Sequence, residues 1–283
     1  KGLPESIATT TEEAVARADD FYEFCGEYKR LKSAYALRSL ISCSESLICQ
    51  ITEHADDRQA LLQAHMNEYP GEVNFFLQRF QKRPYEYLDS FHVLSDRFIG
   101  AHSIMVSAHE RALLRERDVK VCHCPFSNCG KGVPETPALL EDGICVGLGT
   151  DGAAHGGLSL WNEMKIFRSV MNVKHGVAQS NPAIMSAAQI ISMATKEGYR
   201  LMKEEGGVIA EGKKADFITI NTMQSHLYPT GNLVNTLLEC VTASDVCDMA
   251  VDGRLLMKDR EVLTLDEEKI LYEAMKYMEE VNT

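Results

Sequence analysis

The chain has 283 residues, of which 45% are hydrophobic and 25% are charged, so it is long enough for one large domain and a small one. Its net charge of −12 argues against nucleic acid or an anionic membrane as a partner, and no apolar run approaches the roughly 20 residues that span a bilayer. Nine cysteines form no regular disulfide framework, and we therefore expect free thiols in a reducing cytoplasm.

The first two thirds of the chain alternate between short apolar runs and segments with helical spacing. Expected strands cover 33–41, 61–65, 98–102, 119–124 and 144–149. Expected helices cover 8–30, 44–53, 71–81, 84–90, 107–117, 134–142, 159–174 and 186–203. This alternation predicts a mostly parallel sheet with helices outside it. Polar residues at the strand ends favour an incomplete (β/α) barrel of the TIM type, with about five strands and a site at its C-terminal mouth.

The pattern changes after Gly206-Gly207. The runs 208–216 and 217–221 are short and β-like, and a hairpin is expected at 246–257 around the turn Asp252-Gly253. The last segment, 266–281, has apolar residues at helical spacing. The sequence therefore predicts a small β module that carries no catalytic residue, followed by a closing helix that packs back on the barrel.

Three of the expected strands end on a residue that can bind a metal ion: His65, His102 and Asp151. The carboxyl ends of parallel strands lie at one edge of a sheet, so these side chains are expected to face one cavity. Two imidazoles and a carboxylate are the composition of a metal site with nitrogen and oxygen ligands. Glu68 follows His65 by three residues and can shuttle protons at the same cavity. Taken alone, His65 and Glu68 would more readily be surface residues.

Four motifs occur along the barrel region in a characteristic order: His65-Met66-Asn67-Glu68, Gly100-Ala101-His102, Cys124-Pro125-Phe126-Ser127-Asn128 and 147–152. They resemble the barrel motifs of the amidohydrolase superfamily, in its branch of nucleobase and nucleoside deaminases and triazine chlorohydrolases. Residues 206–217 and 250–254 resemble segments of the family's β-sandwich. The resemblance implies a partial barrel at 1–205, the C-terminal half of a β-sandwich at 206–263 and the closing helix at 264–283.

The resemblance also implies roles for single residues. His65, His102 and Asp151 would bind one divalent metal ion, zinc in preference to iron. Asp151 would take a proton from the attacking water, His102 would polarise the bond under attack, and Glu68 would move a proton to the leaving group. Glu68 would also contact the substrate. Asn128 is a further candidate for substrate contact, although Ser127 and Asn128 equally fit a turn filled by polar residues. His155 follows Asp151 in a Gly-rich loop that could cover the site, and it is either a substrate contact or an ordinary loop histidine. The implied reaction is hydrolytic deamination of an amino-substituted N-heterocycle, such as a nucleobase, nucleoside or triazine.

One departure from the family pattern is the missing His-x-His pair at the end of the first barrel strand, which supplies two metal ligands. We expect the chain to correspond to the C-terminal two thirds of such an enzyme, to hold metal weakly by itself, and to cover its sheet edges with loops or with a second copy in a homo-oligomer. Two alternatives remain open: chloride displacement from a triazine on the same scaffold, and a non-catalytic partial barrel. A small-molecule substrate is the expected partner, without nucleic acid or membrane.

Overall fold

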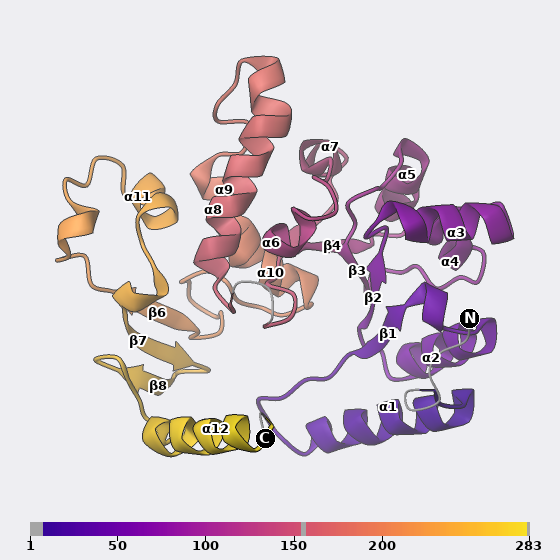
Figure 1. The fold of residues 1–283 in the computed structure, drawn as a ribbon, viewed down its shortest axis with the longest axis horizontal. Helices are drawn as coiled ribbons and strands as arrows, with labels where there is room; N and C mark the ends of the chain where they lie inside the picture. The colour runs from indigo at the N-terminus through magenta and orange to yellow at the C-terminus, as the bar shows by residue number, and fades with distance from the viewer. Residues whose placement is uncertain (1–7, 154–156, 282–283) are drawn as a thin grey trace. The chain divides into compact units, whose positions relative to one another are not determined.

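The computed structural model describes residues 8–153 and 157–281, and the chain divides into two compact units, Lys1–Glu204 and Glu205–Thr283 (Figure 1). The first unit contains five strands: β1 (Tyr35–Ser39), β2 (Leu62–Met66), β3 (Phe98–His102), β4 (Lys120–His123) and β5 (Val146–Leu148). Its helices are α1 (Thr11–Gly26), α2 (Glu45–Asp57), α3 (Pro70–Phe80), α4 (Pro84–Asp89), α5 (Ala108–Glu116), α6 (Pro125–Asn128), α7 (Thr136–Glu141), α8 (Leu160–Met171), α9 (Ala187–Ala194) and α10 (Lys196–Leu201).

The five strands form one parallel sheet in the order β1-β2-β3-β4-β5, so every neighbour in the sheet is also a neighbour in the chain. At least one helix lies between each pair of consecutive strands, which confirms the predicted α/β alternation. Strands β3 and β5 are buried along almost their whole length, as in a parallel sheet covered on both faces. The register pairs Met66 with His102 and His123 with Leu148, so the ends of these strands lie at one edge of the sheet.

Side-chain caps fix where several helices begin. Thr10 and Glu13 form a capping box at α1, Ser107 and Glu110 form one at α5, and the Ser44 hydroxyl accepts a hydrogen bond from the Leu47 N–H at α2. Ser44 and Ser107 are the first residues of the predicted helices 44–53 and 107–117, whereas Thr10 lies two residues inside the predicted helix 8–30. The cap of α5 matters for the site because its glutamate, Glu110, also accepts hydrogen bonds from Asn67, the residue that follows β2.

Two predictions of secondary structure are wrong. The segment 186–203 does not form one helix, because α9 and α10 are separated at Thr195, whose backbone leaves the helical region at φ −128° and ψ −91°. No strand forms at 208–216 in the described structure, and the second unit starts its sheet at Phe217. The sequence also gave no sign of α6, a helix of four residues between β4 and α7.

The second unit contains an antiparallel sheet in the order β6 (Phe217–Ile220), β7 (Val246–Val251), β8 (Arg254–Lys258) and β9 (Glu261–Val262). Asp252 and Gly253 join β7 to β8 with φ values of 51° and 71°, the conformation that an Asp-Gly hairpin turn requires. Helices α11 (Leu233–Glu239) and α12 (Glu267–Val281) complete the unit, and no described residue of α12 is buried. Packing of α12 on the barrel stays a prediction.

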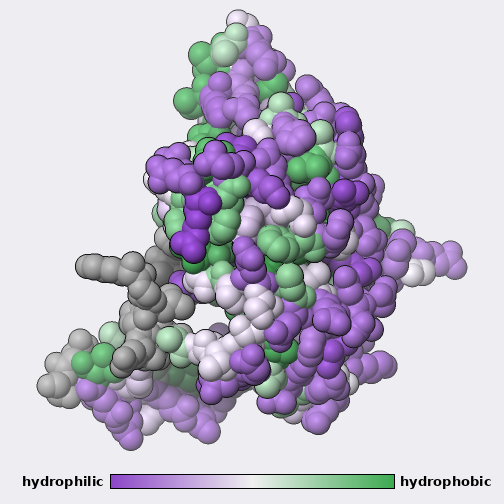
Figure 2. Space-filling view, turned by 90° about the vertical axis from the view of Figure 1, so that its right-hand side faces the viewer, coloured by the Kyte–Doolittle hydropathy of each residue, from purple (hydrophilic) through white to green (hydrophobic). Residues whose placement is uncertain are grey.

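The surface in view in Figure 2 is mostly hydrophilic, and its hydrophobic side chains lie in small separate groups. Scattered apolar side chains of this kind are normal on globular proteins and mark no particular binding face. Among the described residues, none of the helices combines the length and the apolar character that crossing a membrane would need.

The core beneath the end of β3 leaves no space for a side chain at Gly100. A Cβ atom built there would collide with the hydroxyl of Tyr85 and lie 3.0 Å from its Cζ atom. Tyr85 is fully buried, and its hydroxyl lies 2.6 Å from Oγ of Ser103. The glycine therefore lets a buried tyrosine pack against the strand two residues before His102.

We expect Gly100→Ala to lower the free energy of unfolding by about 1–3 kcal/mol, because the fixed Tyr85 ring must shift to make room. Chemical denaturation measures this change. Gly26→Ala is the control, since a Cβ at that helical position meets no atom within 4 Å. Adding Tyr85→Phe to Gly100→Ala removes the colliding hydroxyl and should recover part of the loss. Equal stability of the two single glycine variants would contradict this packing argument.

Candidate metal centre

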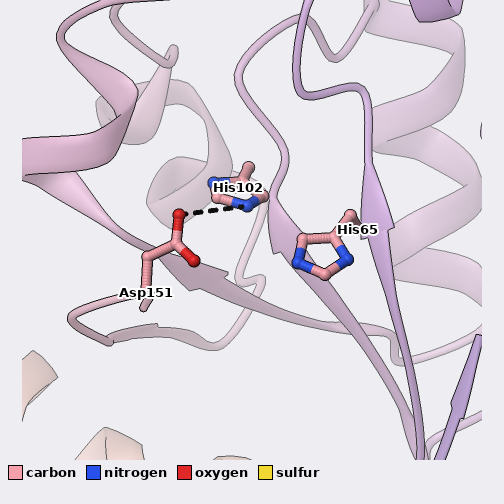
Figure 3. Close-up of side chains that lie close together, drawn as sticks. All are labelled: His65, His102 and Asp151. Atoms are coloured by element: carbon pink, nitrogen blue, oxygen red, sulfur yellow. Dashed lines mark ion pairs between the residues drawn. The ribbon is translucent and has the colours of Figure 1, made fainter. Parts of the chain in front are cut away.

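Two histidines stand at the ends of neighbouring parallel strands. His65 belongs to β2 and His102 ends β3, and their rings stack with centroids 5.2 Å apart and planes 22° from parallel. His102 is buried, whereas His65 is partly exposed. Figure 3 shows the two imidazoles beside each other, with the carboxylate of Asp151 facing His102 from the segment after β5.

Each imidazole is oriented by a hydrogen bond at Nδ1. His65 Nδ1 contacts the backbone carbonyl of Arg38 on β1, and His102 Nδ1 lies 3.0 Å from Oδ1 of Asn128. Both partners are acceptors, so each ring donates its Nδ1 proton and keeps a lone pair at Nε2. Metal-ligating histidines are held in this way in proteins, by a partner on the other ring nitrogen.

Asp151 is the third member of the group. Its Oδ2 accepts a hydrogen bond of 2.6 Å from the hydroxyl of Ser127, and its Oδ1 accepts one of 2.7 Å from the N–H of Gly152. Burial opposes ionisation, but these hydrogen bonds outweigh it and hold the pKa of Asp151 below its usual value. One ligand atom each from His65, His102 and Asp151 lies within 4.8 Å of the others, a spacing that one metal ion can bridge.

The backbone is left-handed at two of these three residues. His102 has φ of 66° and Asp151 has φ of 58°, a region that residues other than glycine seldom adopt, although asparagine, aspartate and histidine enter it more often than the rest. A residue held in this region costs roughly 1–3 kcal/mol. The surrounding hydrogen bonds maintain this conformation, which turns both side chains at the point where their strands end.

Glu68 lies beside the same imidazole. Its Oε1 is 3.5 Å from Nε2 of His102, and Oδ2 of Asp151 is 4.0 Å from that nitrogen. The Lys131 ammonium lies 2.6 Å from the same Glu68 oxygen and donates a 2.8 Å hydrogen bond to Oγ of Ser127. Burial lowers the pKa of His102, which keeps its imidazole neutral and able to bind a metal.

A layer of buried polar residues holds the loop that carries Glu68. The Asn67 side chain donates to both carboxylate oxygens of Glu110 at 2.9 and 3.0 Å, and Arg83 Nε donates to one of them at 2.7 Å. Glu110 is fully buried, so these donors compensate its charge. The Glu68 N–H donates to Oε2 of Glu72 at 2.8 Å, which fixes the loop from its other side.

His123 supports His102 from behind. It is fully buried, its Nδ1 donates to the carbonyl oxygen of His102 at 2.7 Å, and its Nε2 accepts from the hydroxyl of Thr136 at 3.0 Å. Burial lowers the pKa of His123 to about 4, so this ring stays neutral at physiological pH. Its role is structural, since one ring nitrogen is engaged by the backbone carbonyl of His102 and the other by the Thr136 hydroxyl.

The structure therefore brings together four of the residues that the sequence singled out: His65, Glu68, His102 and Asp151. Asn128 is buried and contacts His102, and its expected contact with substrate stays a prediction. His155 lies outside the described residues. Sequence reasoning missed Lys131, although its position four residues after Ser127 is the spacing at which side chains meet along a helical turn.

A cavity opens beside this group, lined by His65, His102 and Asp151 together with Gln63, Cys122 and Cys124. All the cysteines that the structure describes are free thiols. The cavity runs from these three residues along the strands as far as Gln63 and Ile99, near the starts of β2 and β3.

Comparisons with known proteins agree on one family. The model of the amidohydrolase family matches residues 3–257. A 5-methylthioadenosine/S-adenosylhomocysteine deaminase of Dictyoglomus thermophilum is 35% identical over 239 residues, which cover 83% of this chain and 55% of that protein. A 5'-deoxyadenosine deaminase of Methanothermobacter thermautotrophicus is 34% identical over 245 residues, covering 86% and 56% respectively. The chain thus spans little more than half the length of these relatives.

Solved structures show the same fold at lower sequence identity. A zinc-bound adenosine deaminase from Xanthomonas campestris superposes with a TM-score of 0.91 at 22% identity, covering 99% of this chain and 64% of that protein. Atrazine chlorohydrolase from Arthrobacter aurescens TC1, complexed with zinc, superposes with a TM-score of 0.86 at 20% identity, covering 97% and 62%. At these identities the likeness is one of fold.

We expect Glu72→Gln to change how stability depends on pH. Burial raises the pKa of Glu72 to about 7 although the Glu68 N–H opposes the shift, so the folded state favours the protonated carboxyl. The cost of ionising Glu72 is absent below the unfolded pKa near 4.5, grows as the pH rises, and is complete above about 7. The glutamine has no such cost and should be about 1–2 kcal/mol more stable than the parent at pH 8.

Urea denaturation of both chains between pH 4.5 and 8 measures this difference. Near pH 4.5 the two chains should have similar stability. The matched control is Glu116→Gln, because Glu116 is exposed in the last turn of α5. A difference between Glu72→Gln and its parent that stays constant across this pH range would show that Glu72 does not titrate as argued.

Proposed function

The chain belongs to the amidohydrolase family, and we propose that it carries the metal centre of an enzyme that hydrolytically deaminates an amino-substituted N-heterocycle. The observation that carries this proposal is that His65 and His102, on the neighbouring strands β2 and β3, and Asp151, in the segment after β5, offer ligand atoms within 4.8 Å of one another. The relatives above 30% identity are deaminases of adenosine derivatives, which supports a purine nucleoside as the substrate class. The triazine enzyme shares only the fold and supports no second activity.

The donor set fits a zinc ion. Two imidazoles that are engaged at Nδ1 and leave Nε2 for a ligand, together with one carboxylate, match the three protein ligands of a catalytic zinc site that keeps a position open for water. Nitrogen and carboxylate ligands also suit iron, but two similar solved structures contain zinc. We therefore favour zinc as the resident metal. The family's His-x-His pair would add ligands to those that this chain supplies.

The architecture around the site follows from the same family. The parallel sheet β1 to β5 would form part of a TIM-type (β/α) barrel, and the antiparallel sheet β6 to β9 would form part of a β-sandwich. The strand ends that carry His65 and His102 would then face the barrel mouth, where barrel enzymes place their chemistry. Helix α12 would pack against the barrel in the complete protein.

The chemistry is assigned to residues by geometry. A bound divalent ion would lower the pKa of a coordinated water toward about 7. Asp151, kept ionised by Ser127, is placed to accept the proton of the attacking water. His102 is placed to polarise the bond that the water attacks. Glu68, beside His102, is placed to pass a proton to the departing amino group, so that water and the amino heterocycle yield the oxo heterocycle and ammonia.

Two further properties are proposed for the protein. The free cysteines are typical of a reducing cytoplasm, because thiols of this number seldom stay unpaired in oxidising compartments. Strands β1 and β5 are the edges of the five-stranded sheet in the described part of the chain. Such edges are usually covered, and we propose that additional barrel strands or a second copy of the chain cover them.

We expect His65→Ala, His102→Ala and Asp151→Asn each to weaken zinc binding by at least about tenfold, because each removes one of three ligands. Equilibrium dialysis with metal analysis measures the affinity of the chain and its variants. His109→Ala serves as the control, since the His109 side chain is 71% exposed on α5. Zinc affinity unchanged in all three site variants would exclude this centre.

Glu68→Gln tests the catalytic assignment separately. The variant should retain zinc but release ammonia from aminopurine nucleosides about 10²–10⁴ times more slowly, because the amide cannot transfer the proton. Ammonia release is measured in the zinc-loaded protein, with the parent chain assayed beside it. Glu116→Gln, far from the chemistry on the surface of α5, is the matched control. Turnover of Glu68→Gln close to that of the parent would remove Glu68 from the mechanism.

A further inference from the structure

Lys131 closes a ring of charged and polar groups at the edge of the metal centre. Its ammonium lies 2.6 Å from Glu68 Oε1 and 2.8 Å from Ser127 Oγ, and the Ser127 hydroxyl donates to Asp151 Oδ2 at 2.6 Å. Both carboxylates face Nε2 of His102. One cation is thus linked to both acids, to Glu68 directly and to Asp151 through the serine.

The ring is shielded from water. The side chains of Lys131 and Glu68 are 24% and 21% exposed, and that of Asp151 is 23% exposed. An ion pair at this depth is less screened than a surface pair, so the position of Lys131 affects the charge near the metal ligands. The pair also fixes the Glu68 carboxylate, whose Oε1 is held between the ammonium and the imidazole.

Without Lys131, Glu68 would be able to bind the metal ion itself. Its Oε1 lies 3.5 Å from the His102 nitrogen that offers a lone pair, nearer than the 4.0 Å of Asp151 Oδ2, which belongs to the ligand group. A carboxylate binds zinc at about 2.0–2.2 Å, and a small rotation of the Glu68 side chain would bring an oxygen to an ion on that nitrogen. A Glu68 carboxylate bound to the metal ion could not transfer a proton to the departing amino group of the substrate.

We propose that Lys131 is a positioning residue that holds Glu68 beside the metal centre and outside its set of ligands. This inference rests on the proposed function, because it concerns how the catalytic glutamate is kept available. Lys131 takes part in no bond-making step. The Lys131 ammonium competes with the metal ion for the Glu68 carboxylate. It is also connected to Asp151, because Ser127 accepts a hydrogen bond from Lys131 and donates one to Asp151.

Cobalt(II) is the probe for the test, since its visible absorption reports the number and type of ligands. Lys131→Met should bind Co(II) roughly tenfold more tightly than the parent, because one repelling charge is lost and one carboxylate is released. Its spectrum should differ from that of the parent. If Lys131 only supported the fold, Lys131→Met would instead bind Co(II) more weakly than the parent and would have the same spectrum.

A double-mutant cycle shows whether the effect passes through Glu68. Glu68→Gln alone should keep the Co(II) spectrum of the parent and bind somewhat more weakly, because an attractive charge is lost. Lys131→Met with Glu68→Gln should return both affinity and spectrum close to those of the parent. Lys131→Arg should also keep the parent values, because it retains the charge. Such a result would also show that the site folds with a different side chain at this position. Lys174→Met is the matched control, as Lys174 forms an ion pair of the same 2.6 Å length with Glu135.

The outcomes separate this inference from the proposed function. A parent chain that binds Co(II), with a Lys131→Met variant that binds equally or more weakly, would overturn the role of Lys131 and leave the metal centre standing. A parent that binds no Co(II) would overturn the proposed function. If the parent binds no Co(II), the inference would still be supported by a Lys131→Met variant that binds Co(II) and a double variant with Glu68→Gln that does not. A Lys131→Met variant that also binds no Co(II) would overturn the inference.

Discussion

The hydrogen bonds at Nδ1 of His65 and His102 are the constraint on which the whole site depends. An imidazole that donates from Nδ1 to a fixed oxygen has one tautomer and one ring orientation, so its Nε2 lone pair points to a defined place. The two acceptors come from different parts of the first unit, the backbone of β1 and the side chain of Asn128. The register of the parallel sheet places the two imidazoles next to each other, because it pairs Met66, the residue after His65, with His102. The two acceptors then set the orientation of each ring.

This arrangement is maintained at the expense of local stability. His102 and Asp151 adopt left-handed backbone conformations, and Glu72 and Glu110 place two carboxyl groups in the buried layer under the loop of Asn67 and Glu68. Glu110 has a guanidinium and an amide as donors, whereas Glu72 has backbone N–H donors and burial raises its pKa to about 7. Such a network is rigid because each member fixes the next, and rigidity is what a preorganised metal centre needs.

The sequence predicted the framework well because its signals are local. Apolar runs that end on His65, His102 and Asp151 indicated strands with ligands at their ends, and caps such as Ser107 indicated where helices begin. The break at Thr195 was missed because the apolar spacing of α9 and α10 is continuous across it. His123 was missed because its contacts, with the His102 carbonyl and Thr136, join separate segments that no spacing along the chain reveals. Lys131 was missed, although its spacing from Ser127 is a local signal, because its contact with Glu68 joins distant segments.

The short helix α6 and the turn after it connect the parts of the site. Phe126 donates its N–H to Glu163 of α8 at 2.8 Å, which anchors the helix, while Ser127 and Asn128 hold Asp151 and His102. The Gly132 N–H bonds to the Asn128 carbonyl, so the chain continues to turn and places Lys131 beside Ser127. Seven residues, 125–131, thus orient one imidazole and both carboxylates. Because one segment contacts all three groups, a movement of α6 would displace His102, Asp151 and Glu68 together.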